Sequence, residues 1–186
     1  MTTKLIFRGV YDIVGNKQVG LIVLTDEEKA RQVSLVCDHN MVVQLSLRLE
    51  KNVRLEKLLP EVLWTVVKRY NDMDFMLLFS DVKDGEYITY LCSIDNSVAI
   101  QLRASDAVLL AVISGLPIMM DSQLFCRHST PYYGAKSKVA VPLASLSREM
   151  LEEALQKAVE AEDYEKASQL RDELLRRKKD NDSEKS

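Results

Sequence analysis

The segment from residue 98 to residue 118 constrains the fold more than any other part of the chain. Residues 98–102 are rich in β-forming side chains, and residues 106–114 form an apolar helical run. Gly115 ends this helix, and Pro117 prevents its continuation before a second apolar strand begins. The polar corner between the first strand and the helix is where such a unit usually carries its chemistry.

This order of elements occurs twice in the chain. A hairpin, a strand and a capped helix are predicted over 4–50 and again over 73–114, with corresponding positions 65 residues apart. Asp38 or Asn40 is expected to cap the first helix, and Ser105 the second. The sequence therefore predicts an α+β fold. In it, a duplicated hairpin-strand-helix unit forms a mixed, largely antiparallel sheet around helices, and a helical hairpin follows at the C-terminus.

A further helix is predicted between the two units, over 55–70. Pro60 is tolerated only in a first helical turn, so we expect the helix to begin near Leu58. Its apolar residues recur at spacings of three and four and define one apolar face, formed by Leu59, Val62, Leu63, Val66 and Val67.

Charge and cysteine content restrict the function classes. The chain has 186 residues with 25 basic and 28 acidic side chains, and the part before residue 148 is neutral. This balance argues against a broad basic face for nucleic acid. Three widely spaced cysteines, Cys37, Cys92 and Cys126, indicate free thiols in a reducing compartment. No apolar run is long enough for a signal peptide or a membrane span, so we expect a cytoplasmic protein without a membrane partner.

The C-terminal segment reads as two short amphipathic helices that face each other across narrow apolar stripes. The first stripe is Leu151, Leu155, Ala158 and Val159, and the second is Tyr164, Ala167, Leu170 and Leu174. Such a hairpin has little core of its own, so it is either a tail folded onto the main domain or a docking module.

The run from Asp163 to Asp172, DYEKASQLRD, resembles the UVR motif, a helical hairpin through which bacterial excision-repair subunits meet. The resemblance implies bacterial descent and a protein partner bound through 148–178. The residues it assigns to partner binding are Tyr164, Glu165, Ala167, Leu170, Arg171 and Asp172. We expect a main domain at 1–130, a loop and linker at 131–147, the hairpin at 148–178, and a disordered tail at 179–186.

The corner Arg103-Ala104-Ser105-Asp106 is the main candidate for chemistry. A helix N-terminus favours anions, and the Arg103 guanidinium suits a phosphate or a carboxylate. Asp106 is able to pair with Arg103, to coordinate a metal ion or to act as a base. A structural Arg–Asp pair at a capped helix explains the same residues without any chemistry.

The corner, followed by Ala107 and later by Pro117, resembles the signature of the bifunctional nuclease domain family over about residues 4–130. The family usually has proline where this chain has Ala104. It also usually has Arg-Pro-x-Thr-His-Asp, where this chain has Arg54-Leu55-Glu56-Lys57-Leu58-Leu59. The resemblance implies a nuclease acting on DNA or RNA, with Arg103, Ser105 and Asp106 as catalytic residues. A divalent metal, magnesium or manganese, would be held by Asp106, Asp95 and Asp84.

Two functions from different classes follow. The first is a metal-assisted nuclease with a C-terminal docking hairpin. The second is a non-catalytic, oligomeric interaction protein that recruits a partner through the same hairpin, and the missing Thr-His-Asp residues favour it. Under either interpretation, we expect a homo-oligomer, because strand-rich domains of this size commonly pair.

Overall fold

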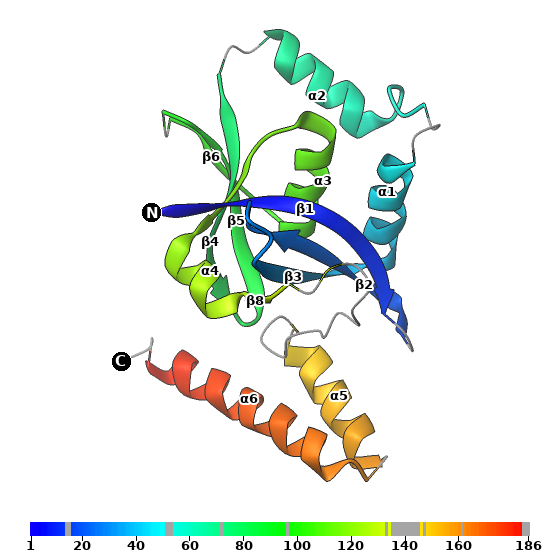
Figure 1. Cartoon of the computed structure of the whole chain (residues 1–186), viewed down its shortest axis with the longest axis vertical. Helices are drawn as coiled ribbons and strands as arrows, with labels where there is room; N and C mark the ends of the chain where they lie inside the picture. Colours follow the sequence, from blue (N-terminus) through cyan, green and yellow to red (C-terminus); the bar gives the residue numbers. More distant parts are fainter. Residues whose placement is uncertain are drawn as a thin grey trace. The chain divides into compact units, whose positions relative to one another are not determined.

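The computed structural model describes residues 1–13, 16–50, 54–70, 73–95, 97–132, 134, 146, 148–160 and 162–183. The turn of the first predicted hairpin therefore lies partly outside the described residues, and so does most of the linker expected at 131–147. The chain divides into two compact units (Figure 1). The first, the sheet unit, comprises residues 1–82 and 87–139. The second, the hairpin unit, comprises residues 83–86 and 140–186.

In the described part of the chain, eight strands form one mixed sheet in the order β6-β5-β4-β7-β1-β2-β3-β8. The registers are antiparallel except between β4 and β7, which run parallel. The α+β fold with a mostly antiparallel sheet is thus confirmed. The strands are β1 Thr2–Ile13, β2 Asn16–Thr25, β3 Arg31–Asp38, β4 Phe75–Lys83, β5 Glu86–Ser93, β6 Ala99–Leu102, β7 Ile118–Asp121 and β8 Thr130–Pro131.

The helices of the sheet unit are α1 His39–Leu49, α2 Leu59–Tyr70, α3 Ala104–Ser114 and α4 Ser122–His128. Strands β1, β2 and β3 lead into α1, and β4, β5 and β6 lead into α3, so the predicted repeat of elements is present. Helix α4 was not predicted from the sequence. The Asp121 carboxylate caps it by accepting hydrogen bonds from the backbone N–H groups of Gln123 and Leu124, at 2.9 and 3.0 Å.

Strand β1 joins the two repeats. Its first residues, Thr2 to Leu5, pair with β7, and its later residues, Ile6 to Ile13, pair with β2. Strand β7 also pairs with β4. Through β7, strand β1 therefore connects the strands of the first repeat with those of the second in one continuous sheet.

The core lies between the sheet and helices α1, α3 and α4. Met41, Val42 and Leu45 of α1 are buried in one cluster with Ala107 and Val108 of α3. The amphipathic spacing of α1 explains this packing, because its apolar residues recur three and four positions apart. Gly115 closes α3 as expected, with a left-handed φ of 76° and its N–H bonded to the Ala111 carbonyl at 2.8 Å.

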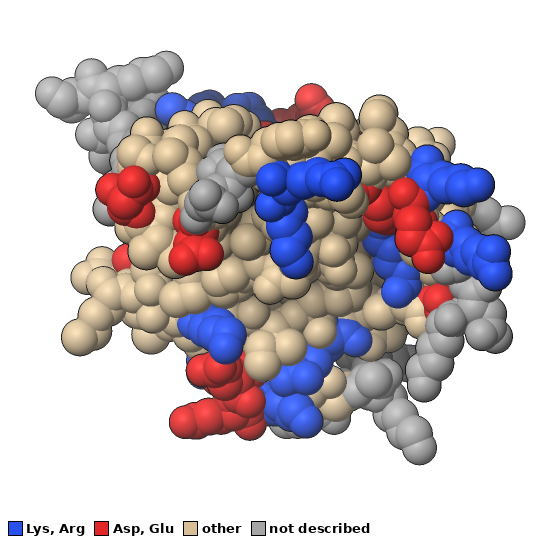
Figure 2. All heavy atoms as spheres, turned by 90° about the horizontal axis from the view of Figure 1, so that it is seen from above, with Lys and Arg blue, Asp and Glu red and all other residues tan. Residues whose placement is uncertain are grey.

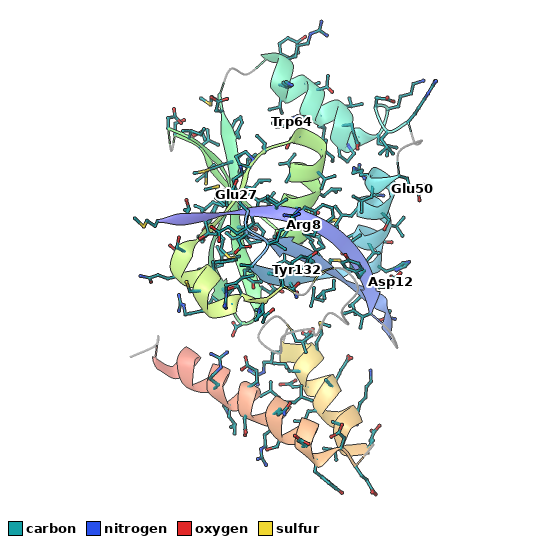
Figure 3. All side chains as sticks on the ribbon, viewed as in Figure 1. Arg8, Asp12, Glu27, Glu50, Trp64 and Tyr132 are labelled. Atoms are coloured by element: carbon teal, nitrogen blue, oxygen red, sulfur yellow. The ribbon has the colours of Figure 1, made fainter. Side chains whose placement is uncertain are left out.

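Helix α2 departs from the ordinary rule for amphipathic helices. None of the residues that the structure describes in α2 is buried, although its sequence carries a strong apolar face. Pro60, Glu61 and Trp64 are the half-buried positions, and the apolar face points to solvent. Trp64 lies on the side of α2 that faces α3 (Figure 3).

The hairpin unit consists of α5 Arg148–Glu160 and α6 Tyr164–Ser183. Leu151 and Ala158 of α5 are buried against Ala167 and Leu170 of α6, which confirms the predicted helical hairpin. Two residues assigned to the stripes, Val159 and Tyr164, are instead exposed, at 52% and 69%. The tail expected to be disordered from residue 179 is instead helical through Ser183. In the described residues, no helix is long and apolar enough to cross a membrane.

Candidate functional site

Two helix N-termini meet at one corner of the sheet unit. Helix α1 starts where β3 ends, with Asp38 as its N-cap residue, and α3 follows β6, with Arg103 as its N-cap residue. These two residues lie 65 positions apart in the sequence, which is the offset of the predicted repeat. In the structure, Arg103 Nη1 lies 3.7 Å from Asp38 Oδ2. The two repeats therefore bring their equivalent cap residues into an ion pair.

The Arg103 guanidinium also pairs with the carboxylate of Asp106, in the first turn of its own helix. Its Nε donates to Asp106 Oδ2 at 2.7 Å, and its Nη2 donates to Asp106 Oδ1 at 3.3 Å. The hydrogen bond to Asp106, followed by the charge of that carboxylate, raises the pKa of Arg103. Two bonds from one planar fork fix the guanidinium more firmly than a single contact does.

The corner is open to solvent. The side chains of Arg103, Asp38 and Asp106 are 68%, 47% and 37% exposed. Asp38 Oδ1 accepts from the N–H of Met41 at 2.8 Å and so caps α1, which leaves Oδ2 for Arg103. One cation between two carboxylates gives the three-residue cluster a formal charge of −1.

Ser105 differs from its predicted role. It was expected to cap α3, but the helix begins at Ala104, two residues earlier than predicted, and Arg103 holds the cap position. Ser105 is buried, with 9% of the residue exposed, so it lies inside the first turn and away from the open face of the corner. The serine's small size suits this packing, and the corner's exposed groups are Arg103 and its two carboxylate partners.

The structure does not gather the three acids predicted as metal ligands into one group. Asp106 follows one end of β6, and Asp95 precedes the other end, because Leu102 pairs with Thr89 while Ala99 pairs with Cys92. Over the residues that the structure describes, no group of three or more His, Cys, Asp or Glu side chains could hold a metal ion. Asp84 lies in the tight turn between β4 and β5, with a φ of 52°.

Asp95 has a local structural role instead. Hydrogen bonds from Ser93 and then from the backbone and hydroxyl of Ser97 lower the pKa of Asp95 to about 2. The Ser97 N–H and hydroxyl donate to Asp95 Oδ1 at 3.0 and 2.7 Å. The carboxylate therefore organises the turn between β5 and β6.

Asp38 is the site residue that sequence reasoning missed. It was assigned only a capping role, although the 65-residue offset that relates the two helix starts also relates Asp38 to Arg103. Applying that offset to the cap residues themselves would have predicted that the two face each other.

The residues predicted to bind a partner through the hairpin divide into two sets. Ala167 and Leu170 are buried between α5 and α6, with 8% and 1% exposed, so they hold the hairpin together. The remaining four are exposed and available on its surface: Tyr164, Glu165, Arg171 and Asp172. Tyr164 is 69% exposed. It was assigned to the stripe between the two helices, but it lies outside that stripe.

The architecture is that of a mixed-sheet α+β protein with an exposed Arg–Asp corner and an appended helical hairpin. Comparison with known families matches residues 22–132 to the bifunctional nuclease domain. Residues 146–180 match the UvrB/uvrC motif. Because the first match covers more than half of the chain, the chain belongs to the bifunctional nuclease domain family. No curated protein matches the chain.

Proposed function

We propose that the sheet unit is a nuclease whose phosphate-binding group is Arg103. The observation that carries this proposal is the placement of an exposed guanidinium at a corner where two helix N-termini meet. Helix N-termini attract anions, and a planar guanidinium binds phosphate oxygens in pairs. The corner thus offers the chemistry that a phosphodiester needs.

Each residue of the corner has a distinct part in this proposal. Arg103 binds and orients the phosphate. To do so, its guanidinium must break its hydrogen bonds to the Asp106 carboxylate. Asp106, released by that exchange, is the candidate base for an attacking water. Asp38 holds Arg103 from the opposite side through its free carboxylate oxygen. Ser105, which is buried, supports the first turn of α3.

A divalent cation, magnesium or manganese, remains part of the proposal. The cluster formed by Arg103 and its two carboxylates is negative, so a polyanionic substrate needs further positive charge there. Asp106 and Asp38 supply oxygen atoms of the type that such ions prefer. When bound, the ion would stabilise negative charge on the phosphate. The structure offers no comparable support for Asp95, which its serine neighbours already engage.

Cleavage of labelled single-stranded DNA and RNA by the purified full chain tests the proposal. Activity should depend on added magnesium or manganese, and Asp106→Asn should reduce it by about 100-fold or more. Glu28→Gln, at an exposed turn position, is the matched control and should cleave like the parent chain. An Asp106→Asn variant that cleaves at the parent rate would show that the activity comes from elsewhere.

A second function is supported by a separate observation. The UvrB/uvrC motif match covers the hairpin, and Tyr164 presents a large aromatic surface beside three exposed charged residues. Aromatic side chains exposed in this way are typical anchors of protein interfaces. We therefore propose that the hairpin docks a protein partner, whether or not the sheet unit is catalytic.

Co-purification tests this second proposal. Bait made from the full chain should retain a defined partner, identified by mass spectrometry, that Tyr164→Ala loses. Glu153→Gln on the exposed surface of α5 is the control and should retain it. Equal recovery by the parent, by Tyr164→Ala and by a chain lacking 148–186 would rule out docking through the hairpin.

We also propose a reducing, cytoplasmic location. Cys37 and Cys92 are buried free thiols, and Cys126 is an exposed free thiol. An exposed thiol persists most readily where the surroundings are reducing. Fractionation of the source cells with an antibody against the chain would test this location.

A further inference from the structure

Helix α2 turns its apolar face away from its own domain. The most exposed apolar positions are Leu59, Leu63, Val66 and Tyr70, with 69%, 55%, 48% and 80% of their surface in solvent. Their spacing of four, three and four residues places them in one line along the helix, which we call the α2 seam. This spacing is that of the contact positions in a pair of coiled helices.

The opposite side of α2 holds the helix to the sheet unit. Glu61 pairs with Arg48 of α1 at 2.6 Å, and Trp64 lies toward α3 (Figure 3). Because polar and aromatic groups already fix this side, rotating α2 to bury its seam would break the Arg48–Glu61 pair. The outward direction of the seam is therefore a property of the folded domain.

The seam is the centre of a larger apolar surface. Val62 and Val67 flank the seam with 41% and 39% exposed, and Leu58 continues it with 39%. Together these side chains expose on the order of 600 Å² of apolar surface, at the upper end for a patch on a monomer. A stable interface buries about 800 Å² per partner, which this patch and its polar rim would supply.

We propose that the α2 seam is the interface of a homodimer, in which α2 of one copy packs antiparallel against α2 of a second copy. A two-fold axis between Leu63 and Val66 sets Leu63 against Val66 of the other copy, and Leu59 against Tyr70. An isologous interface of this kind uses one patch twice, so the patch must be complementary to itself. A seam without charged residues meets this requirement.

The charges at the end of α2 favour the antiparallel over the parallel arrangement. The last turn of α2 carries Lys68 and Arg69, and Arg48 already pairs with Glu61, the acidic residue of the first turn, on the side away from the seam. Parallel pairing would place the two basic ends side by side, which is unfavourable. Antiparallel pairing keeps the two basic ends apart and aligns the helix dipoles favourably.

The face that carries α2 supports a protein partner rather than a nucleic acid. Seen from above, this face is largely uncharged, and the basic and acidic side chains that it shows are interspersed (Figure 2). The inference does not rest on nuclease activity.

Sedimentation velocity on the full chain tests the proposal. From about 1 to about 100 µM, the parent should reach twice the chain mass of 21.2 kDa. Leu63→Glu should raise the dissociation constant by about 100-fold or more, because it buries a carboxylate at the centre of each seam. Its circular dichroism spectrum should match the parent, since residue 63 is exposed in the monomer. Tyr70→Glu, at the end of the seam, should weaken the dimer in the same direction.

A control and a rescue make the test specific. Val159→Glu, at an equally exposed apolar position of the hairpin unit, should leave the dimer intact. Mixing Leu63→Glu with Val66→Lys should restore a dimer, because position 63 of one copy faces position 66 of the other and the opposite charges then meet. A monomeric parent at about 100 µM would overturn the proposal. So would dimers that survive Leu63→Glu or that depend on Val159.

Discussion

Arg48 of α1 and Glu61 of α2 form an ion pair that is almost entirely removed from water. Arg48 Nη2 lies 2.6 Å from Glu61 Oε1, and the two side chains are only 3% and 16% exposed. Arg48 Nη1 also donates to the backbone and side-chain oxygens of Gln44, at 2.8 and 2.9 Å. Within the described residues, Arg48 Nε and Glu61 Oε2 have no hydrogen-bond partner. This pair fixes the rotation of α2 about its own axis.

Replacing Arg48 with methionine should destabilise the sheet unit by about 3 kcal/mol, because it leaves the Glu61 carboxylate buried without a counter-charge. Urea unfolding followed by circular dichroism measures the loss. The double variant Arg48→Met, Glu61→Met should recover most of it, since both charges are then absent. Arg69→Met, on the exposed surface of α2, should stay within about 0.5 kcal/mol of the parent. A double variant no more stable than Arg48→Met would contradict this account.

Gly20 should not tolerate a methyl group. A Cβ at this position would lie 2.1 Å from Val42 Cγ2 and 3.1 Å from the Tyr11 carbonyl oxygen. Valine is stiff in a helix, so Gly20→Ala forces β2 and α1 apart and should cost about 1–3 kcal/mol. Thermal unfolding measures this cost. Combining it with Val42→Ala should cost less than the sum of the single changes, and strict additivity would disprove the clash.

The three cysteines should differ sharply in reactivity. Burial, followed by the nearby Asp38 charge, raises the pKa of Cys37 to about 11, and burial also raises the pKa of Cys92. At about pH 8, an aromatic disulfide reagent should therefore titrate Cys126 in the folded chain and all three thiols in denaturant. Cys126→Ser should abolish the fast reaction. A fast reaction that persists in this variant would mean that Cys37 or Cys92 is accessible.

Stability in acid should report on Asp95. Its folded pKa of about 2 lies below the ordinary value of 3.8, so the ionised carboxylate stabilises the turn. This contribution is complete above about pH 4 and is lost as the pH falls towards about 2. Asp95→Asn should therefore be less stable than the parent near neutrality, and the difference in unfolding midpoint should shrink in acid.

Ser97→Ala removes the hydroxyl hydrogen bond to Asp95 Oδ1 and leaves the bond from the backbone N–H of residue 97 in place. It should raise the pKa of Asp95 towards its ordinary value, as measured by nuclear magnetic resonance titration. If the difference in unfolding midpoint between the parent and Asp95→Asn stays constant with pH, the Asp95 carboxylate does not stabilise the turn in its ionised form.

Local signals in the sequence were sufficient to predict most of the helices and strands of the sheet unit. Asp38 caps α1 and Gly115 closes α3 as expected, because caps depend on the residue and its immediate neighbours. Helix α4 was missed although Asp121 caps it, because its seven residues are too few to show a helical period. The direction of the α2 seam was also beyond local patterns, because the long-range pair between Arg48 and Glu61 determines it.

The candidate site was predictable only in its parts. Arg103 and Asp106 lie three residues apart, so their pairing follows from helical spacing. The approach of Asp38 depends on how two distant helices pack, and the separation of Asp95 from Asp106 depends on strand register. These relations become visible only once the sheet is assembled.

The pairing of strand β1 limits where a shortened fragment of this chain can begin. The family match begins at residue 22, yet β1 lies wholly before it and pairs on both sides, with β2 and with β7. A fragment starting at the match boundary would expose two unpaired strand edges in the middle of the sheet, which invites aggregation. The smallest piece able to fold on its own must therefore keep its first residues.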